Sequence, residues 1–201
     1  MLREAFSMRL SRLISLCVWT LATMALASAT QAASLAGQRT MSLVSPSGEK
    51  TVIGHVRLTP KDNGYAYEVT YNKAAFTERY MEETNFLCLP GQHGDICQFP
   101  YPPGEYSPND STGFFKDDDL RPLEYAMLFA ERRGNDVDIN PFNGIYYRLH
   151  VVQEHLEGTL FAADFRLLIG TGNDAKYPLD GSNLDTVDLK DQRYPKIVIE
   201  W

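Results

Sequence analysis

Three oxygen-bearing residues come nearest to the spacing of a chemical site. Asp136, Asp138 and Asn140 stand at alternate positions, as in the first part of an EF-hand calcium loop, which also needs Gly at its sixth position and Glu at its twelfth. Pro141 and Tyr147 occupy those two positions, so the EF-hand is excluded. A calcium site of another kind stays open, with a polar turn as the alternative, and no other cofactor is expected.

Other catalytic patterns are weak or absent. His150 and His155 lie five residues apart without the H-E-x-x-H spacing of a zinc hydrolase. The chain has no G-x-S-x-G motif, and the glycines near Gly170 do not form a dinucleotide fingerprint. Of the 26 Asp and Glu residues, all but Glu4 lie beyond the N-terminal leader. They offer many pairs for a carboxylate-dependent hydrolase, and the sequence singles out none.

Aromatic residues are the candidate binding residues. Tyr101, Tyr106 and Phe114 lie in a segment rich in Pro and Gly, residues 100–119. Tyr146 and the tyrosine after it point to opposite faces of a predicted strand, so one ring is expected in the core and the other outward. Rings with polar tips suit sugar or peptide recognition. We expect a small molecule, a glycan or an envelope protein as partner; the alternative is that these rings cover the end of a barrel.

Residues 1–32 have the three parts of a secretory signal peptide. Arginines precede an uncharged apolar run of 14 residues, 13–26, and small residues follow. We predict cleavage after Ala32, with Ala29 as the second candidate. A retained anchor is less favoured, since a membrane helix needs roughly 18–20 apolar residues. No later run is long enough, so we expect no membrane span after cleavage and a periplasmic or extracellular location.

Residues 33–201 have the length of one ordinary domain with its own core. The full chain of 201 residues has a net charge of −7, and the leader carries three Arg against Glu4, which leaves residues 33–201 at −9. Affinity for nucleic acids comes mainly from Lys and Arg on phosphates. The acidic balance therefore argues against a nucleic-acid partner.

Two cysteines remain after the leader, Cys88 and Cys97. An even pair in an oxidising compartment is typical of a disulfide. Apolar residues flank both cysteines, and a turn-forming segment, residues 90–95, separates them. We predict a hairpin with the disulfide across it. A redox-active pair is the alternative, although such pairs usually have C-x-x-C spacing.

Alternating apolar residues predict a mainly β domain. The pattern with period two is typical of half-buried strands, and it recurs along the chain, as in Tyr65, Tyr67, Val69 and Tyr71. Turn residues between the segments favour an antiparallel meander, hence a small barrel, with a sandwich as the alternative. We also predict a short helix over 73–83, and a helical turn leading into a strand over 119–132, with Asp119 as a possible N-cap. Long loops are predicted at 100–119 and 170–195.

Residues 33–201 resemble a set of exported bacterial proteins that have no assigned activity. The resemblance lies in the two cysteines followed by Phe99-Pro100-Tyr101-Pro102, then in Leu123-Glu124-Tyr125, and in Asn143-Gly144-Ile145-Tyr146-Tyr147-Arg148-Leu149. In architecture alone the pattern is similar to small calycin-like barrels, which implies no function.

The leading expectation is an exported, non-enzymatic binding or envelope-accessory protein. It depends on the lack of catalytic motifs and on the aromatic loops of a disulfide-bonded scaffold. An inhibitor of a secreted enzyme is the first alternative, because an acidic loop would be steered into a basic cleft. A carboxylate-dependent hydrolase is the second.

Overall fold

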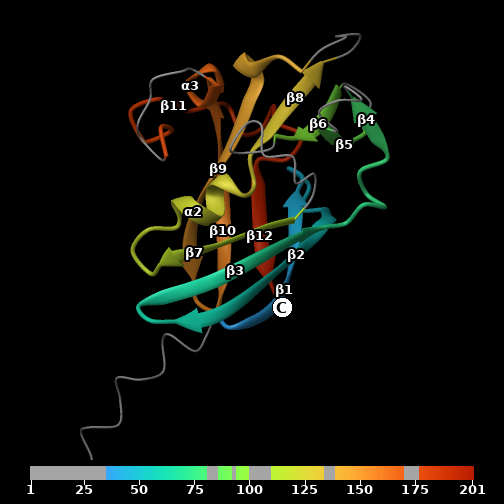
Figure 1. The fold of residues 1–201 in the computed structure, drawn as a ribbon. Helices are drawn as coiled ribbons and strands as arrows, with labels where there is room; N and C mark the ends of the chain where they lie inside the picture. The colour runs from blue at the N-terminus through green and yellow to red at the C-terminus, as the bar shows by residue number, and fades with distance from the viewer. Residues whose placement is uncertain (1–34, 81–85, 92–93, 100–109, 134–138, 170–176) are drawn as a thin grey trace, which may run out of the picture. The chain divides into compact units, whose positions relative to one another are not determined.

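The computed structural model describes residues 35–80, 86–91, 94–99, 110–133, 139–169 and 177–201. Most of its elements are strands (Figure 1). The strands are β1 (Gly37–Val44), β2 (Lys50–Lys61), β3 (Gly64–Tyr71), β4 (Glu78–Tyr80), β5 (Phe86–Leu89), β6 (Gly94–Gln98), β7 (Asp110–Lys116), β8 (Phe129–Arg133), β9 (Gly144–Val152), β10 (His155–Ala163), β11 (Leu184–Asp185) and β12 (Lys196–Glu200). The helical elements are α2 (Arg121–Tyr125), α3 (Arg166–Ile169) and the 3-10 turn η1 (Pro141–Asn143). The predicted leader, residues 1–32, lies outside the described residues.

The strands form one antiparallel sheet. Its order is β4-β5-β6-β8-β9-β10-β12-β1-β2-β3-β7, and β11 pairs with β10. The sheet curls into a half-barrel (Figure 1) and leaves β4 and β7 as its two ends. The predicted mainly β, antiparallel fold is confirmed. Neighbours in sequence pair as hairpins, β2 with β3 and β9 with β10, because a two-residue turn joins each pair.

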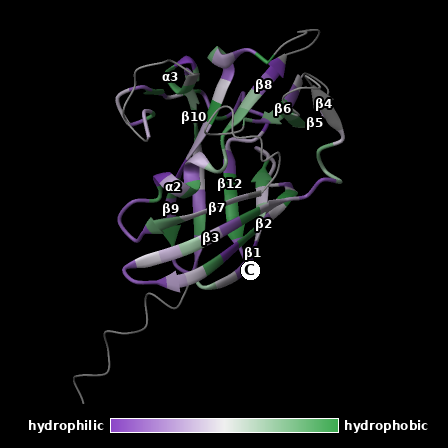
Figure 2. Cartoon of the chain, in the orientation of Figure 1, coloured by the Kyte–Doolittle hydropathy of each residue, from purple (hydrophilic) through white to green (hydrophobic). Residues whose placement is uncertain are grey.

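The main core lies on one face of this sheet. The apolar residues of the alternating sequence pattern point into it. In β3, Tyr65, Val69 and Tyr71 are at most 3 % exposed, whereas Glu68 between them is exposed. Figure 2 shows hydrophobic residues concentrated in the strands and hydrophilic ones in the connections. The largest contributors to this core include Met41, Leu43, Ile53, Val56, Leu58, Tyr65, Tyr67, Phe115, Phe129, Tyr147, Leu156, Leu160, Ile197 and Ile199.

A second, smaller core covers the other face of β5, β6, β8 and the first half of β9. Both Tyr146 and Tyr147 are therefore buried, at 2 % and 0 % exposed, although they point to opposite faces. The same double burial makes every residue of β5 buried. The members of this second core are Phe86, Cys88, Cys97, Phe99, Tyr125, Leu128, Ala130, Tyr146, Ala163, Phe165, Leu168 and Leu179.

The predicted disulfide is confirmed. Cys88 and Cys97 lie directly opposite each other on β5 and β6, and their sulfur atoms are bonded at 2.03 Å. Both side chains are fully buried in the second core. Asp95, in the same hairpin, accepts a hydrogen bond from the Gly91 N–H at 3.1 Å and pairs with Arg132 at 2.9 Å. A disulfide of this kind indicates an oxidising compartment.

The helix predicted over 73–83 is wrong where the structure describes that segment. The side-chain oxygen of Asn72 accepts the Ala74 N–H at 3.2 Å, and its carbonyl accepts the Ala75 N–H at 2.9 Å. Such a local bond offers the main chain a turn in place of a helix. β4 follows and pairs with β5, so sheet pairing prevails over the helix propensity of the side chains.

The prediction over 119–132 is confirmed, because α2 leads into β8. Its N-cap residue is Leu120 and not Asp119. The Asp119 carboxylate instead accepts the Arg121 N–H at 3.2 Å and pairs with the Arg121 guanidinium at 2.8 Å. The prediction of a loop over 100–119 is wrong for residues 110–116, which form β7. This strand pairs with β3 and buries Phe115 against Tyr65 and Tyr67. The predicted 170–195 loop contains β11.

One buried arginine joins three distant parts of the chain. Arg39 is 1 % exposed, and its guanidinium donates to the carbonyl oxygens of Leu35 at 2.8 Å and Glu154 at 2.5 Å. It lies 4.2 Å from the centre of the Trp201 ring. Burial lowers the pKa of Arg39 from its usual value. The segment before β1, the β9–β10 turn and the residue after β12 thus meet at one side chain.

Within the described part of the chain, none of the helices has the length and hydrophobicity to cross a bilayer.

Removing the disulfide should destabilise the domain without unfolding it. For the double variant Cys88→Ala/Cys97→Ala we expect a loss of about 2–4 kcal/mol in the free energy of unfolding, since the bond closes a loop of about ten residues in the unfolded chain. Urea denaturation with and without reductant measures this loss. Reductant should lower the stability of the wild type only. Equal stability of wild type and variant would contradict the expectation.

Candidate functional site

The half-barrel has an opening between β7 and β9, and α2 occupies part of it. Within the described residues, β8 pairs with β9 only through Phe129 with Ile145 and Ala130 with Gly144. From Tyr146 onward, β10 is the neighbour of β9 among the described strands. β7 ends the sheet at the other side of the opening, and α2 packs against both strands. A short helix therefore replaces a strand at this point.

Two tyrosines of β3 fasten α2 from one side. The Tyr67 O–H donates to the carbonyl oxygen of Pro122, and the Tyr71 O–H to that of Ala126, each at 2.8 Å. Burial raises the pKa of Tyr67 to about 12 and raises that of Tyr71 as well. Both hydroxyls therefore stay protonated and keep donating at neutral pH.

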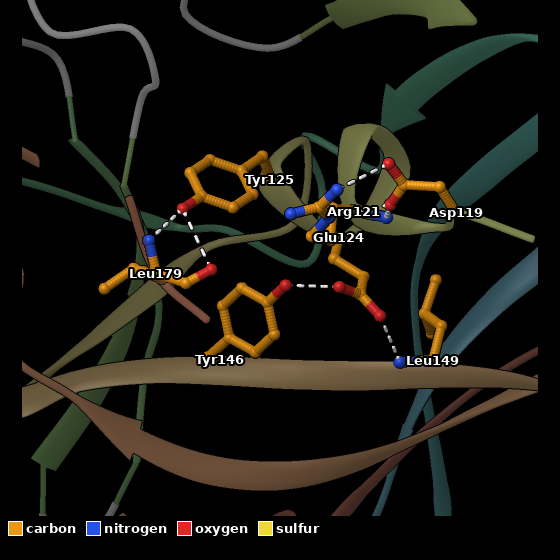
Figure 3. A network of polar contacts seen from close by, with 7 residues as sticks. All are labelled: Asp119, Arg121, Glu124, Tyr125, Tyr146, Leu149 and Leu179. Atoms are coloured by element: carbon orange, nitrogen blue, oxygen red, sulfur yellow. Dashed lines mark hydrogen bonds and ion pairs between the residues drawn. The ribbon is translucent and has the colours of Figure 1, made fainter. Parts of the chain in front are cut away.

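Glu124 fastens α2 from the other side (Figure 3). Its carboxylate accepts the main-chain N–H of Leu149 at 2.7 Å and the hydroxyl of Tyr146. The side chain is 4 % exposed, and this burial raises the pKa of Glu124. Burial, together with the charge of Glu124, raises the pKa of Tyr146. The carboxylate thus satisfies a strand N–H that β8 does not reach.

Tyr125 connects α2 to the segment 177–184 (Figure 3). Its hydroxyl oxygen accepts the Leu179 N–H at 2.5 Å, and the same group lies 3.4 Å from the Leu179 carbonyl oxygen. The ring stands edge-on to Tyr146 and to Tyr177, with centroids 6.0 and 4.9 Å apart. This segment is thereby held over the outer face of β9.

These elements border an open pocket of about 770 Å³. It is lined by residues 116–121 from the β7–α2 connection, by 148–151 of β9 and by 179–181, with Glu124 and Tyr146 between them. Two arginines face this pocket in different states. Arg121 is paired with Asp119, and this contact lowers the pKa of the aspartate. Arg148 makes no hydrogen bond or ion pair with the described residues.

The charges of the lining are mixed, with acids in excess. The pKa of Asp180 is lowered by hydrogen bonds from Ser182 and then by the charges of Arg121 and Arg148. With Asp119 compensated by Arg121, three acids stand against two bases, before Glu124 is counted: Asp117, Asp118, Asp180, Lys116 and Arg148. Such a lining suits a polar ligand with a cationic group.

Among the singled-out residues that the structure describes, one lines this pocket. Tyr146 lines it, although its ring is 2 % exposed and hydrogen-bonded to Glu124. Phe114 lies half-buried on β7, 5.9 Å from the Lys61 ammonium. Tyr101 and Tyr106 lie outside the described residues, and their role as binding residues stays a prediction.

The predicted calcium ligands are only partly described. Asp136 and Asp138 lie outside the described residues. The Asn140 side chain accepts the Phe142 N–H at 2.9 Å and so caps η1. In the described ranges, no three His, Cys, Asp or Glu side chains gather where they could hold a metal ion.

The pocket residues that the sequence did not single out include Arg121, Glu124 and Arg148. A signal existed for Glu124, because it is a charged residue in an otherwise apolar run, residues 123–130. Charged residues are rarely buried without a partner, so its position predicts a specific hydrogen bond. No comparable signal marks the two arginines, because exposed arginines are common in any sequence.

Replacing Glu124 should loosen α2. For Glu124→Leu we expect a loss of about 2–4 kcal/mol in unfolding free energy, since the Leu149 N–H and the Tyr146 hydroxyl lose their acceptor while buried. Glu124→Gln keeps an acceptor for Leu149 and should lose less. Urea denaturation measures both. A Leu variant as stable as the wild type would show that the carboxylate is not needed.

The pH dependence should separate Gln from Glu at this position. Folding raises the pKa of Glu124, so the protonated side chain stabilises the folded state at low pH. This contribution to the free energy of unfolding is lost as pH rises through the folded pKa. The stability of wild type minus Glu124→Gln should therefore fall as pH rises above about 4.3, the ordinary pKa of a glutamate, and level off once pH exceeds the raised pKa of the folded state. The exposed Glu68→Gln serves as the control. A difference that rises with pH would contradict the expectation.

Comparison of the chain with family models, curated proteins and solved structures found no match, so the pocket's chemistry rests on its own residues.

Proposed function

We propose that this is an exported, non-enzymatic binding protein that holds a small polar molecule with a cationic group in the pocket between α2, β9 and residues 179–181. Export is supported by the leader pattern of residues 1–32 and by the buried disulfide. The resemblance to exported bacterial proteins agrees with this location. Neither this resemblance nor the architectural similarity to calycin-like barrels identifies a ligand.

The observation that carries the proposal is the charge of the pocket. Arg121 neutralises Asp119, and Asp117, Asp118 and Asp180 then outnumber Lys116 and Arg148 around a space of about 770 Å³. That volume lies within the range of small-molecule sites. The net charge of −7 for the whole chain adds long-range attraction for a cation.

The interior of the half-barrel is a less suitable place for a ligand. Large side chains fill its core, among them Tyr65, Tyr147, Phe115 and Phe129, all at most 2 % exposed. Close packing of this kind excludes a ligand. The pocket on the outer face of β9 is therefore preferred to the barrel interior.

Binding is preferred to hydrolysis because of how Glu124 is used. It is the lining carboxyl with a raised pKa, as a general acid would require. Each of its oxygens, however, already accepts a hydrogen bond from β9, one from Leu149 and one from Tyr146. These contacts support a structural role. No contact among the described residues gives similar support to a hydrolase or to an inhibitor of a secreted enzyme.

Titration with charged solutes tests the proposal. Cationic probes (lysinamide, argininamide and putrescine) should bind in calorimetry and raise the melting temperature of the protein, because a ligand of the native state stabilises it. Citrate, glutamate and glucose should not. If no cationic probe binds, the proposal is wrong.

Variants locate the site. Asp117→Asn/Asp118→Asn should weaken probe binding about fivefold or more, since each exposed charge pair contributes up to about 1 kcal/mol. Glu49→Gln/Glu68→Gln removes the same charge from exposed positions outside this pocket and should leave affinity almost unchanged. An equal loss in both double variants would mean that only the net charge matters.

A further inference from the structure

We propose that the ligand of this pocket is a short, extended peptide with basic side chains, which adds to the free edge of β9. The inference rests on the proposed function and names the ligand class of the same site. Strand addition to an exposed sheet edge is a general mode of peptide recognition, in which main-chain hydrogen bonds supply affinity.

The register of the β9–β10 hairpin shows which main-chain groups face the opening. Val152 pairs with His155 across the two-residue turn, so this pair exchanges hydrogen bonds. Hydrogen-bonded pairs alternate with non-hydrogen-bonded pairs along an antiparallel ladder. Leu149 and Val151 therefore direct their N–H and C=O groups away from β10. The bond from the Leu149 N–H to Glu124 confirms this direction.

Three main-chain groups of this edge remain for a ligand. Glu124 accepts the Leu149 N–H. No described residue supplies a partner for the Leu149 carbonyl or for the N–H and carbonyl of Val151. An extended peptide opposite Val151 would exchange two hydrogen bonds with it and give a third to Leu149.

The pocket lies along this same stretch. Its lining includes residues 148–151, and the Val151 side chain is 47 % exposed although its partner Leu156 is fully buried. A peptide there would cover this apolar side chain. Its basic side chains would meet Asp117 and Asp118 on the neighbouring connection, and Arg148 would face a carbonyl or carboxylate of the ligand.

The test uses peptide probes with equal side chains and different main chains. One is the hexapeptide Lys-Val-Lys-Thr-Lys-Val-amide, and the other is the same sequence methylated at every internal main-chain nitrogen. The two carry the same charge, so attraction to an acidic protein cannot separate them. We expect the methylated peptide to bind the wild-type protein at least fivefold more weakly, because it cannot donate strand hydrogen bonds.

Variants at Val151 test the edge from the protein side. Val151→Pro removes an N–H that faces the opening and leaves the β10 ladder intact, and proline is tolerated at such edge positions. Val151→Thr keeps the N–H and the branched side chain. Proline should weaken binding of the unmethylated peptide about fivefold or more, with little effect on lysinamide. The threonine variant should lose much less of the peptide's affinity than the proline variant, because it keeps the N–H and gives up only apolar contact.

The outcomes separate the two proposals. Equal affinity for both peptides, or a proline variant that is folded and binds both like the wild type, would refute strand addition while lysinamide binding keeps the proposed function. Failure of every cationic probe would refute both. If Val151→Pro does not fold, as judged by circular dichroism, the pair of peptides on the wild type decides alone.

Discussion

The way β9 satisfies its main chain where β8 ends determines much of this structure. A strand edge enclosed by protein leaves N–H groups without water, and each unpaired group costs stability. Glu124 supplies the missing acceptor to Leu149. Since that carboxylate belongs to α2, the same bond positions the helix, and through Tyr125 it positions residues 177–184 as well. One side chain thus couples the sheet, the helix and the wall of the pocket.

The tyrosines of the core also attach irregular segments to the sheet. Tyr67 and Tyr71 bond to carbonyl oxygens of α2 and its end, and Tyr147 bonds to the carbonyl of Tyr194, each at 2.8 Å. A tyrosine fills core volume with its ring and carries a donor to a main-chain acceptor beyond it. Irregular segments are thereby attached to the sheet without further strands. Much of the aromatic content of this chain thus serves packing and attachment.

Local patterns predicted the local features well. Alternation in β3 and the spacing of Cys88 and Cys97 each concern neighbours in sequence or in one hairpin, and both predictions are confirmed. The helix over 73–83 failed because Asn72 forms a turn and β4 finds a partner in β5. β7 was not predicted because its segment contains prolines and glycines, which are typical of loops. Its pairing with β3 also joins residues that are far apart in sequence.

The pocket itself depends on topology, which explains why the sequence did not reveal it. Its charges come from the β7–α2 connection, from β9 and from the segment after residue 177, and no sequence spacing relates them. Tyr146 was expected to face away from Tyr147, and it does, yet a second core covers it. Period two indicates which face a residue takes; it does not indicate what lies over that face.

The contact between Arg39 and Trp201 gives this protein a built-in optical reporter. The chain has two tryptophans, Trp19 in the predicted leader and Trp201. In a chain that has lost the predicted leader, all indole fluorescence would come from a ring that stacks on a guanidinium held by Leu35 and Glu154. Its emission therefore reports on one place, where the beginning of β1, the β9–β10 turn and the end of β12 come together.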